Sequence, residues 1–122
     1  MRPLTVIVAH ADLASAIGLA ASLQSHFKCT FPVDRSEDLR EAIVRHRANL
    51  VIVDLDLMPL GEVAALRRDF PASCFVCTHC DATEDMADSA RTAGCEGCWR
   101  GTDVRSIVLA ACANVGRWGA SA

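Results

Sequence analysis

Apolar residues fall along the chain in two patterns, continuous runs and stretches at helical spacing. The continuous runs are 4–9 (LTVIVA) and 50–55 (LVIVDL), and such valine- and isoleucine-rich runs are typical of strands covered on both faces of a parallel sheet. Between them, residues 12–27 predict a crossover helix with Asp12 as its N-cap. The inner positions expected for this helix are Leu13, Ala16, Ile17, Ala20, Leu23 and Phe27.

The rest of the chain repeats this alternation of strand and helix. A strand over 29–33 is expected at a sheet edge, because Pro32 cannot donate a ladder hydrogen bond. A helix capped by Ser36 and reaching Arg47 follows it. The later expected elements are a helix over 61–69, a strand over 74–78, a helix over 83–93, a strand over 95–99 and a helix from 102 or 103 to 115.

Five strands alternating with five helices predict an α/β fold with a doubly wound, five-stranded parallel sheet in the order 2-1-3-4-5, the flavodoxin-like arrangement. Residues 1–116 are expected to form one domain, followed by a short tail over 117–122. The core should include Ile7, Val51, Ile52, Val53 and Val76. In such a sheet the functional residues should gather where the strands end, at their carboxyl edge.

Composition and charge exclude several classes of protein. The 12 basic and 15 acidic residues give a net charge of −3 without a dense basic cluster, so nucleic-acid binding by this chain alone is not expected. No apolar stretch is long enough to span a membrane, and the opening MRPLTVIVAH lacks a signal peptide's apolar core, so a cytoplasmic protein is expected. Without a nucleophile elbow, a glycine-rich phosphate loop or a zinc-binding helix motif, the chain is not expected to be an enzyme.

Seven cysteines include a series that resembles a metal site in its spacing. Cys77, Cys80, Cys95 and Cys98 form the pattern C-x2-C-x14-C-x2-C, close to that of four-cysteine zinc sites. However, Cys77 and Cys98 fall in expected strands, where thiols pack well, and the helix between the two pairs would hold them apart. Structural thiols are therefore favoured, with Cys80 the most exposed, and a cysteine-based zinc or redox sensor is the alternative.

Residues 4–115 resemble the receiver domain of bacterial two-component response regulators, the CheY-like family. LVIVDLDLMP at 50–59 is similar to the strand and proline-containing loop around that family's phosphoacceptor, which places Asp54 at the phosphoacceptor position. Thr78 takes the position of the family's switch hydroxyl, and 93–97 (AGCEG) resembles the approach to its last strand. The resemblance implies a signalling function in which Asp54 accepts a phosphoryl group.

Departures from the family pattern affect the same site. Ala9 and His10 replace the two acidic residues that hold Mg²⁺ in the family, so Mg²⁺ binding is expected to be weak or absent, with no other cofactor. Gly101 stands where the family has a lysine that contacts the phosphoryl group, and Lys28, the only lysine, lies far from it in the sequence. Cys98 stands at the family's switch aromatic. The expected function is thus an atypical receiver domain with a weakened phosphoacceptor.

The histidines are expected to differ in importance. An imidazole at His10 beside Asp54 could form an ion pair that titrates near neutral pH, or it could merely fill the space that the metal leaves. His26, His46 and His79 are expected as helix-end or loop residues without convergent partners.

The resemblance also implies partners, namely a sensor kinase or a downstream effector protein, and a homodimer. The expected contact surface lies on the last two helices and the strand between them, and it carries Ala87, Arg91, Cys98, Arg100 and Arg105. The small residues of the first helix offer an alternative dimer surface, formed by Ala14, Ser15, Gly18, Ala21 and Ser22.

Overall fold

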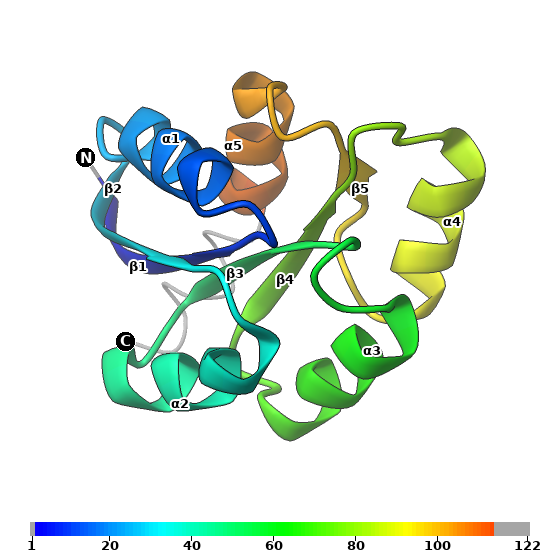
Figure 1. The fold of residues 1–122 in the computed structure, drawn as a ribbon, viewed down its shortest axis with the longest axis horizontal. Coiled ribbons are helices and arrows are strands. Elements are labelled where there is room, and N and C mark those ends of the chain that lie inside the picture. The colour runs from blue at the N-terminus through cyan, green and yellow to red at the C-terminus, as the bar shows by residue number, and fades with distance from the viewer. Residues whose placement is uncertain (1, 114–122) are drawn as a thin grey trace.

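A computed structural model describes residues 2–113 and contains one sheet of strands between two layers of helices (Figure 1). The strands are β1 (Arg2–Ala9), β2 (Phe27–Val33), β3 (Leu50–Asp54), β4 (Cys74–Thr78) and β5 (Cys98–Trp99). The helices are α1 (Leu13–Leu23), α2 (Ser36–His46), α3 (Leu60–Asp69), α4 (Glu84–Thr92) and α5 (Val104–Cys112). All paired strands are parallel in the order β2-β1-β3-β4-β5, which confirms the predicted fold class.

Helices cover both faces of the sheet, α1 and α5 on one face and α2, α3 and α4 on the other (Figure 1). Alternate residues of each continuous apolar run therefore enter opposite clusters: Leu50 and Ile52 face α1 and α5, whereas Val51 and Val53 face the other layer. These four side chains are fully buried. Burying each of these side chains stabilises the fold by about 1.5–3 kcal/mol. Because both faces of the strand are buried, the run contains no alternating polar positions.

The first helix is shorter than predicted. It ends at Leu23, and Phe27 belongs instead to β2, where it is buried against the α1 side of the sheet. The buried stripe of α1 is Ala16, Leu19, Ala20 and Leu23. The predicted inner positions Leu13 and Ile17 are exposed, because successive helical residues point about 100° apart and this stripe leaves them on its flank.

Two other boundaries were wrong for local reasons. Ser36 is the first residue of α2 rather than its cap, and Arg35 caps that helix without a side-chain hydrogen bond. β5 begins at Cys98 instead of residue 95. Gly97, just before it, has φ +155 and lies close under the ring of Trp99, so the chain becomes extended strand only after Gly97.

α5 ends at Cys112, whereas the predicted end at Val115 lies outside the described residues.

Pro32 lies in the edge strand β2, as predicted, opposite Val8 of β1. His46, expected without a partner, stacks on Phe31 of the same edge with ring centroids 3.8 Å apart. Within the described residues, every helix is too short or too polar to cross a bilayer.

Candidate functional site

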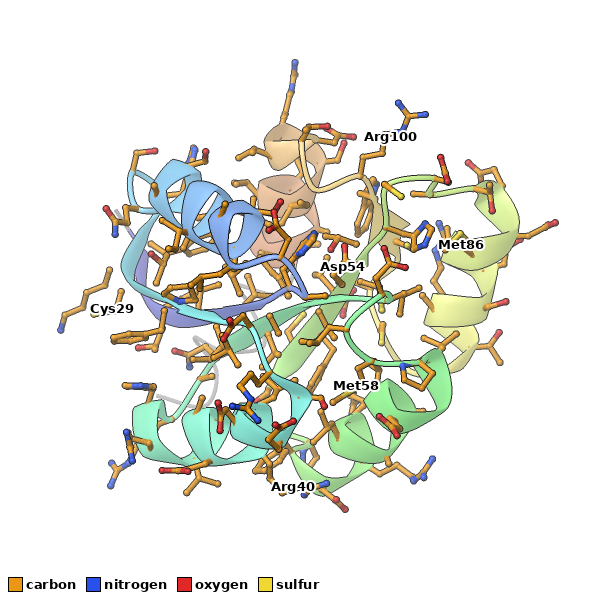
Figure 2. The ribbon with its side chains drawn as sticks, viewed as in Figure 1. Cys29, Arg40, Asp54, Met58, Met86 and Arg100 are labelled. Carbon is orange, nitrogen blue, oxygen red and sulfur yellow. The ribbon has the colours of Figure 1, made fainter. Side chains whose placement is uncertain are left out.

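Asp54 lies at the end of β3, at the centre of the carboxyl edge of the sheet (Figure 2). It is only 2% exposed, and both of its carboxylate oxygens accept hydrogen bonds. Thr78 Oγ1 donates to Oδ2 at 3.0 Å, and the backbone N–H of Asp56 donates to Oδ1 at 2.9 Å. The parallel register pairs Asp54 directly with Thr78 and so brings together two residues that are 24 positions apart.

His10 completes the surroundings of this carboxylate from the end of β1. Its Nε2 lies 3.2 Å from Asp54 Oδ2, and its side chain is 23% exposed. Its Nδ1 accepts the backbone N–H of Asp12 at 3.0 Å, so in the neutral ring the proton is on Nε2 and points to the carboxylate. The structure thus brings the buried Asp54 and Thr78 together with the partly exposed His10 around one carboxylate.

Asp12 is the N-cap of α1, as predicted. Its carboxylate accepts the N–H of Ser15 at 3.1 Å and the hydroxyl of Ser15 at 2.6 Å. These hydrogen bonds lower the pKa of Asp12. The cap fixes the turn that holds the His10 ring, because Asp12 uses its backbone N–H for that ring and its side chain for the helix.

A second histidine repeats this arrangement at the end of β4, where no partner was expected. His79 Nε2 lies 3.2 Å from Asp56 Oδ1, and His79 Nδ1 accepts the backbone N–H of Asp81 at 3.0 Å. The missed signal is visible in the sequence, because HAD at 10–12 and HCD at 79–81 both directly follow predicted strands. Parallel strands bring both motifs to the same edge, one on each side of β3.

An open cleft of about 700 Å³ lies beside Asp54, between α1 and the loop that joins β5 to α5. Gly101 lines this cleft at the position of the expected lysine, and a Cβ atom there would meet no atom within 4 Å. The cleft is therefore wide where a lysine side chain would otherwise lie. Arg100 and Thr102 from the same loop line its rim, and Figure 2 shows Arg100 at the margin of the molecule.

Three of the four cysteines in the zinc-like series are buried together on the face covered by α2, α3 and α4. Cys77 pairs with Cys98 across β4 and β5, and the Cys77 thiol donates to Cys95, which raises the pKa of Cys77 and lowers that of Cys95. Burial, with a contribution from the charge of Asp54, raises the pKa of Cys98 to about 11. Cys80 is exposed beyond the end of β4, as predicted, so the series forms no single four-sulfur cluster among residues 2–113.

The two predicted contact surfaces differ in what they present. Ala87 and Cys98 are buried in the core, so the surface around α4 and α5 presents mainly its arginines. Arg91 is exposed and pairs with Asp88 at 2.7 Å, and Arg100 and Arg105 are also exposed. On α1 all five small residues are exposed, and the half-exposed Leu13 and Ile17 lie among them.

No protein-family model matches the chain, and no curated protein matches its sequence. Solved structures do resemble it. The RcsB response regulator of Salmonella typhimurium superposes with a TM-score of 0.80 at 16% identity, over 96% of this chain and 61% of that one. A response regulator from Burkholderia pseudomallei was solved with a phosphorylated aspartic acid, a calcium ion and citrate. It superposes with a TM-score of 0.77 at 19% identity, over 97% of this chain and 72% of that one.

The receiver domain of the Francisella response regulator 1452 gives a TM-score of 0.78 at 10% identity and covers 93% of this chain and 98% of that domain. The chain therefore spans less than two thirds of the Salmonella protein but nearly all of an isolated receiver domain. The superpositions cover the same α/β topology that the sheet order defines. The chain has the fold of response regulator receiver domains.

Proposed function

We propose that the chain is an atypical receiver domain of bacterial two-component signal transduction, which acts through protein–protein contacts and has a weakened phosphoacceptor. The observation that carries this proposal is the environment of Asp54 within a receiver fold. The buried carboxylate keeps its threonine partner Thr78 at 3.0 Å, but a histidine lies where metal-binding carboxylates would be expected, and Gly101 supplies no cation.

Phosphoryl transfer to a carboxylate needs positive charge or fixed donors around the transferring oxygens. Mg²⁺ would need near-octahedral oxygen ligands, whereas Ala9 offers no side-chain ligand and His10 offers a nitrogen that already contacts Asp54. The residues present do not fit Mg²⁺, and we propose that it binds here weakly or not at all. Thr78 and His10 are the side-chain donors that remain next to Asp54.

The energy available to a phosphorylation switch is correspondingly small. A hydrogen bond from Thr78 to a charged acceptor contributes roughly 1.5–3 kcal/mol, whereas inverting a firm two-state equilibrium needs about 5.5 kcal/mol. A bound partner, or protonation of His10 beside Asp54, is therefore the preferred input. The proposed partners are a sensor kinase or a downstream effector in the cytoplasm, or a second copy of the chain, and no enzymatic activity is proposed.

The test compares amide spectra of the wild type and Asp54→Asn by NMR, with and without acetyl phosphate or beryllofluoride. Neither reagent is expected to move more than the immediate neighbours of Asp54. Shifts that spread from Asp54 through Thr78 to Cys98 in the wild type, and not in the variant, would contradict the weakened phosphoacceptor. A variant that combines Ala9→Asp, His10→Asp and Gly101→Lys is the positive control, because it restores the missing charges on the same fold.

A further inference from the structure

Beyond Asp54, two loops bring an imidazole, a carboxylate and a thiol together at the surface. Asp56 follows β3, whereas His79 and Cys80 follow β4. One ligand atom from each side chain lies within 4.8 Å of the other two, which makes them the one such group of three among residues 2–113. Their side chains have no role in the proposed signalling function, to which Asp56 contributes only its backbone N–H.

We propose that Asp56, His79 and Cys80 bind a divalent transition-metal ion of the zinc class, with the fourth position open to water. A mixed nitrogen, oxygen and sulfur set suits a borderline ion such as Zn²⁺, whereas Mg²⁺ and Ca²⁺ require mostly oxygen ligands. Three ligands from the protein and one open position is also the usual composition of an accessible zinc site.

The spacing of the ligand atoms fits a tetrahedral ion. With Zn–N and Zn–O distances near 2.0 Å and Zn–S near 2.3 Å, neighbouring ligand atoms should lie roughly 3.3–3.6 Å apart. His79 Nε2 and Asp56 Oδ1 are 3.2 Å apart without an ion. The sulfur lies within 4.8 Å of the other two ligand atoms, so it has to approach them by at most about 1.3 Å. Cys80 is exposed and the Asp56 side chain is 59% exposed, so both can make this adjustment at low cost.

The surrounding charge favours a cation. The Cys80 thiol donates to Asp81 Oδ2 at 3.8 Å, so a second carboxylate lies beside the sulfur. Desolvation raises the pKa of Cys80, and the negative charges of Asp81 and Asp56 raise it further. A bound ion would offset this repulsion, because it stabilises the thiolate directly.

Binding has to rearrange two protons. In the metal-free chain His79 Nδ1 accepts the N–H of Asp81, so Nε2 carries the ring proton. An ion on Nε2 moves that proton to Nδ1, which can then no longer accept from Asp81. Cys80 releases its proton to solvent as the sulfur binds, and nothing is oxidised or reduced. The Asp81 amide should therefore report directly on ion binding.

The experiment titrates the reduced full-length chain with ZnCl₂ and, separately, with CoCl₂. One Zn²⁺ per chain is expected, with a sulfur-to-cobalt charge-transfer band for Co²⁺ and a large NMR shift of the Asp81 amide. His79→Gln and Cys80→Ser should each weaken binding more than about tenfold, since even partners outside the ligand set are worth that much. The matched controls His26→Gln and Cys29→Ser, at positions outside the cluster, should change affinity less than about twofold.

Two results would overturn the proposal. One is the absence of saturable binding up to about 0.1 mM Zn²⁺, far above the range of structural zinc sites. The other is binding that survives His79→Gln and Cys80→Ser but is lost in Cys95→Ser, which would assign the ion to the buried cysteines. Asp54→Asn should bind Zn²⁺ like the wild type, so a failure of the metal site and a failure of the phosphoacceptor proposal are distinguishable.

Discussion

His10 and His79 stand at the ends of two strands of one sheet and make the same contacts at different depths. Each ring accepts the backbone N–H two residues further on, and each places Nε2 3.2 Å from a carboxylate, that of Asp54 at the end of β3 or that of Asp56 just beyond it. The Asp54 side chain is 3% exposed, however, whereas that of Asp56 is 59% exposed. Depth decides what each pair can do, because the buried carboxylate of Asp54 has three donors around it, whereas the exposed carboxylate of Asp56 has His79 on one side and solvent on the other.

The depth difference extends to the thiol near each carboxylate. Desolvation raises the pKa of both thiols, with a further contribution from Asp54 at the buried Cys98 and from Asp81 and Asp56 at the exposed Cys80. Carboxylates therefore lie near a thiol sealed in the core and near one open to solvent. The inner site, formed by His10, Asp54 and Thr78, and the outer site, formed by His79, Asp56 and Cys80, should therefore respond differently to the same changes.

Alkylation should separate the two thiols most strongly. With iodoacetamide near pH 8, Cys80 is expected to react more than about a hundredfold faster than Cys98, because Cys98 reacts only when its region opens. Peptide mass spectrometry over a time course measures both rates in one sample. Comparable alkylation rates for Cys80 and Cys98 would contradict this prediction and would mean that the β4–β5 region opens readily. The same measurement on protein unfolded in denaturant gives the intrinsic reactivity of each thiol as a control.

Carboxylates should create a Mg²⁺ site only at the inner position. Ala9→Asp combined with His10→Asp is expected to raise Mg²⁺ affinity by roughly a hundredfold, because two charged oxygen ligands then face the fixed carboxylate of Asp54. His79→Asp, which adds a carboxylate beside the exposed Asp56, should raise the Mg²⁺ affinity far less. Calorimetric titration with Mg²⁺ measures the affinity of both variants. Equal gains in affinity would contradict the expected difference between the buried and the exposed carboxylate.

Removing each histidine should destabilise the chain unequally. His10→Ala is expected to lower the free energy of unfolding by about 1–3 kcal/mol, because it takes a donor from a buried carboxylate. His79→Ala should cost at most about 1 kcal/mol, since its carboxylate is solvated. Urea unfolding followed by circular dichroism measures both, and a larger loss for His79→Ala would refute the ranking.

High pH should destabilise the folded chain through the buried thiol of Cys98. The pKa of Cys98 rises from an ordinary value of 9.0 to about 11 in the folded chain. The folded state therefore holds this proton more firmly, and the associated stability is complete below pH 9 and is lost as the pH rises from 9 to 11. The loss is at most about 2.7 kcal/mol, since each pKa unit corresponds to about 1.36 kcal/mol. Cys98→Ser should reduce the dependence of the unfolding free energy on pH across this range, and should do so more than Cys80→Ser, because Cys80 is exposed.

Much of the fold could be predicted because the apolar runs allow few arrangements. The runs at 4–9 and 50–55 are buried strands, and the sheet order and the closeness of Asp54 to Thr78 follow from parallel neighbours ending at one edge. Phe27 was misplaced because an apolar residue at helical spacing can equally begin the next strand. The absence of a lysine near Asp54 was visible in the sequence, since Lys28 is the only one in the chain.

The pattern of residues was sufficient to predict the secondary structure to within a few residues, the parallel topology and the chemical identity of the groups at the carboxyl edge. Local pattern is sufficient for this, because strand and helix periods differ and crossover connections are right-handed. In contrast, the packing of the folded chain was needed to show that His79 meets Asp56, that Ile17 faces solvent and that Cys80 is separated from the other cysteines of its series. Those outcomes depend on depth and side-chain direction, which arise where separate segments pack together and which no single segment encodes.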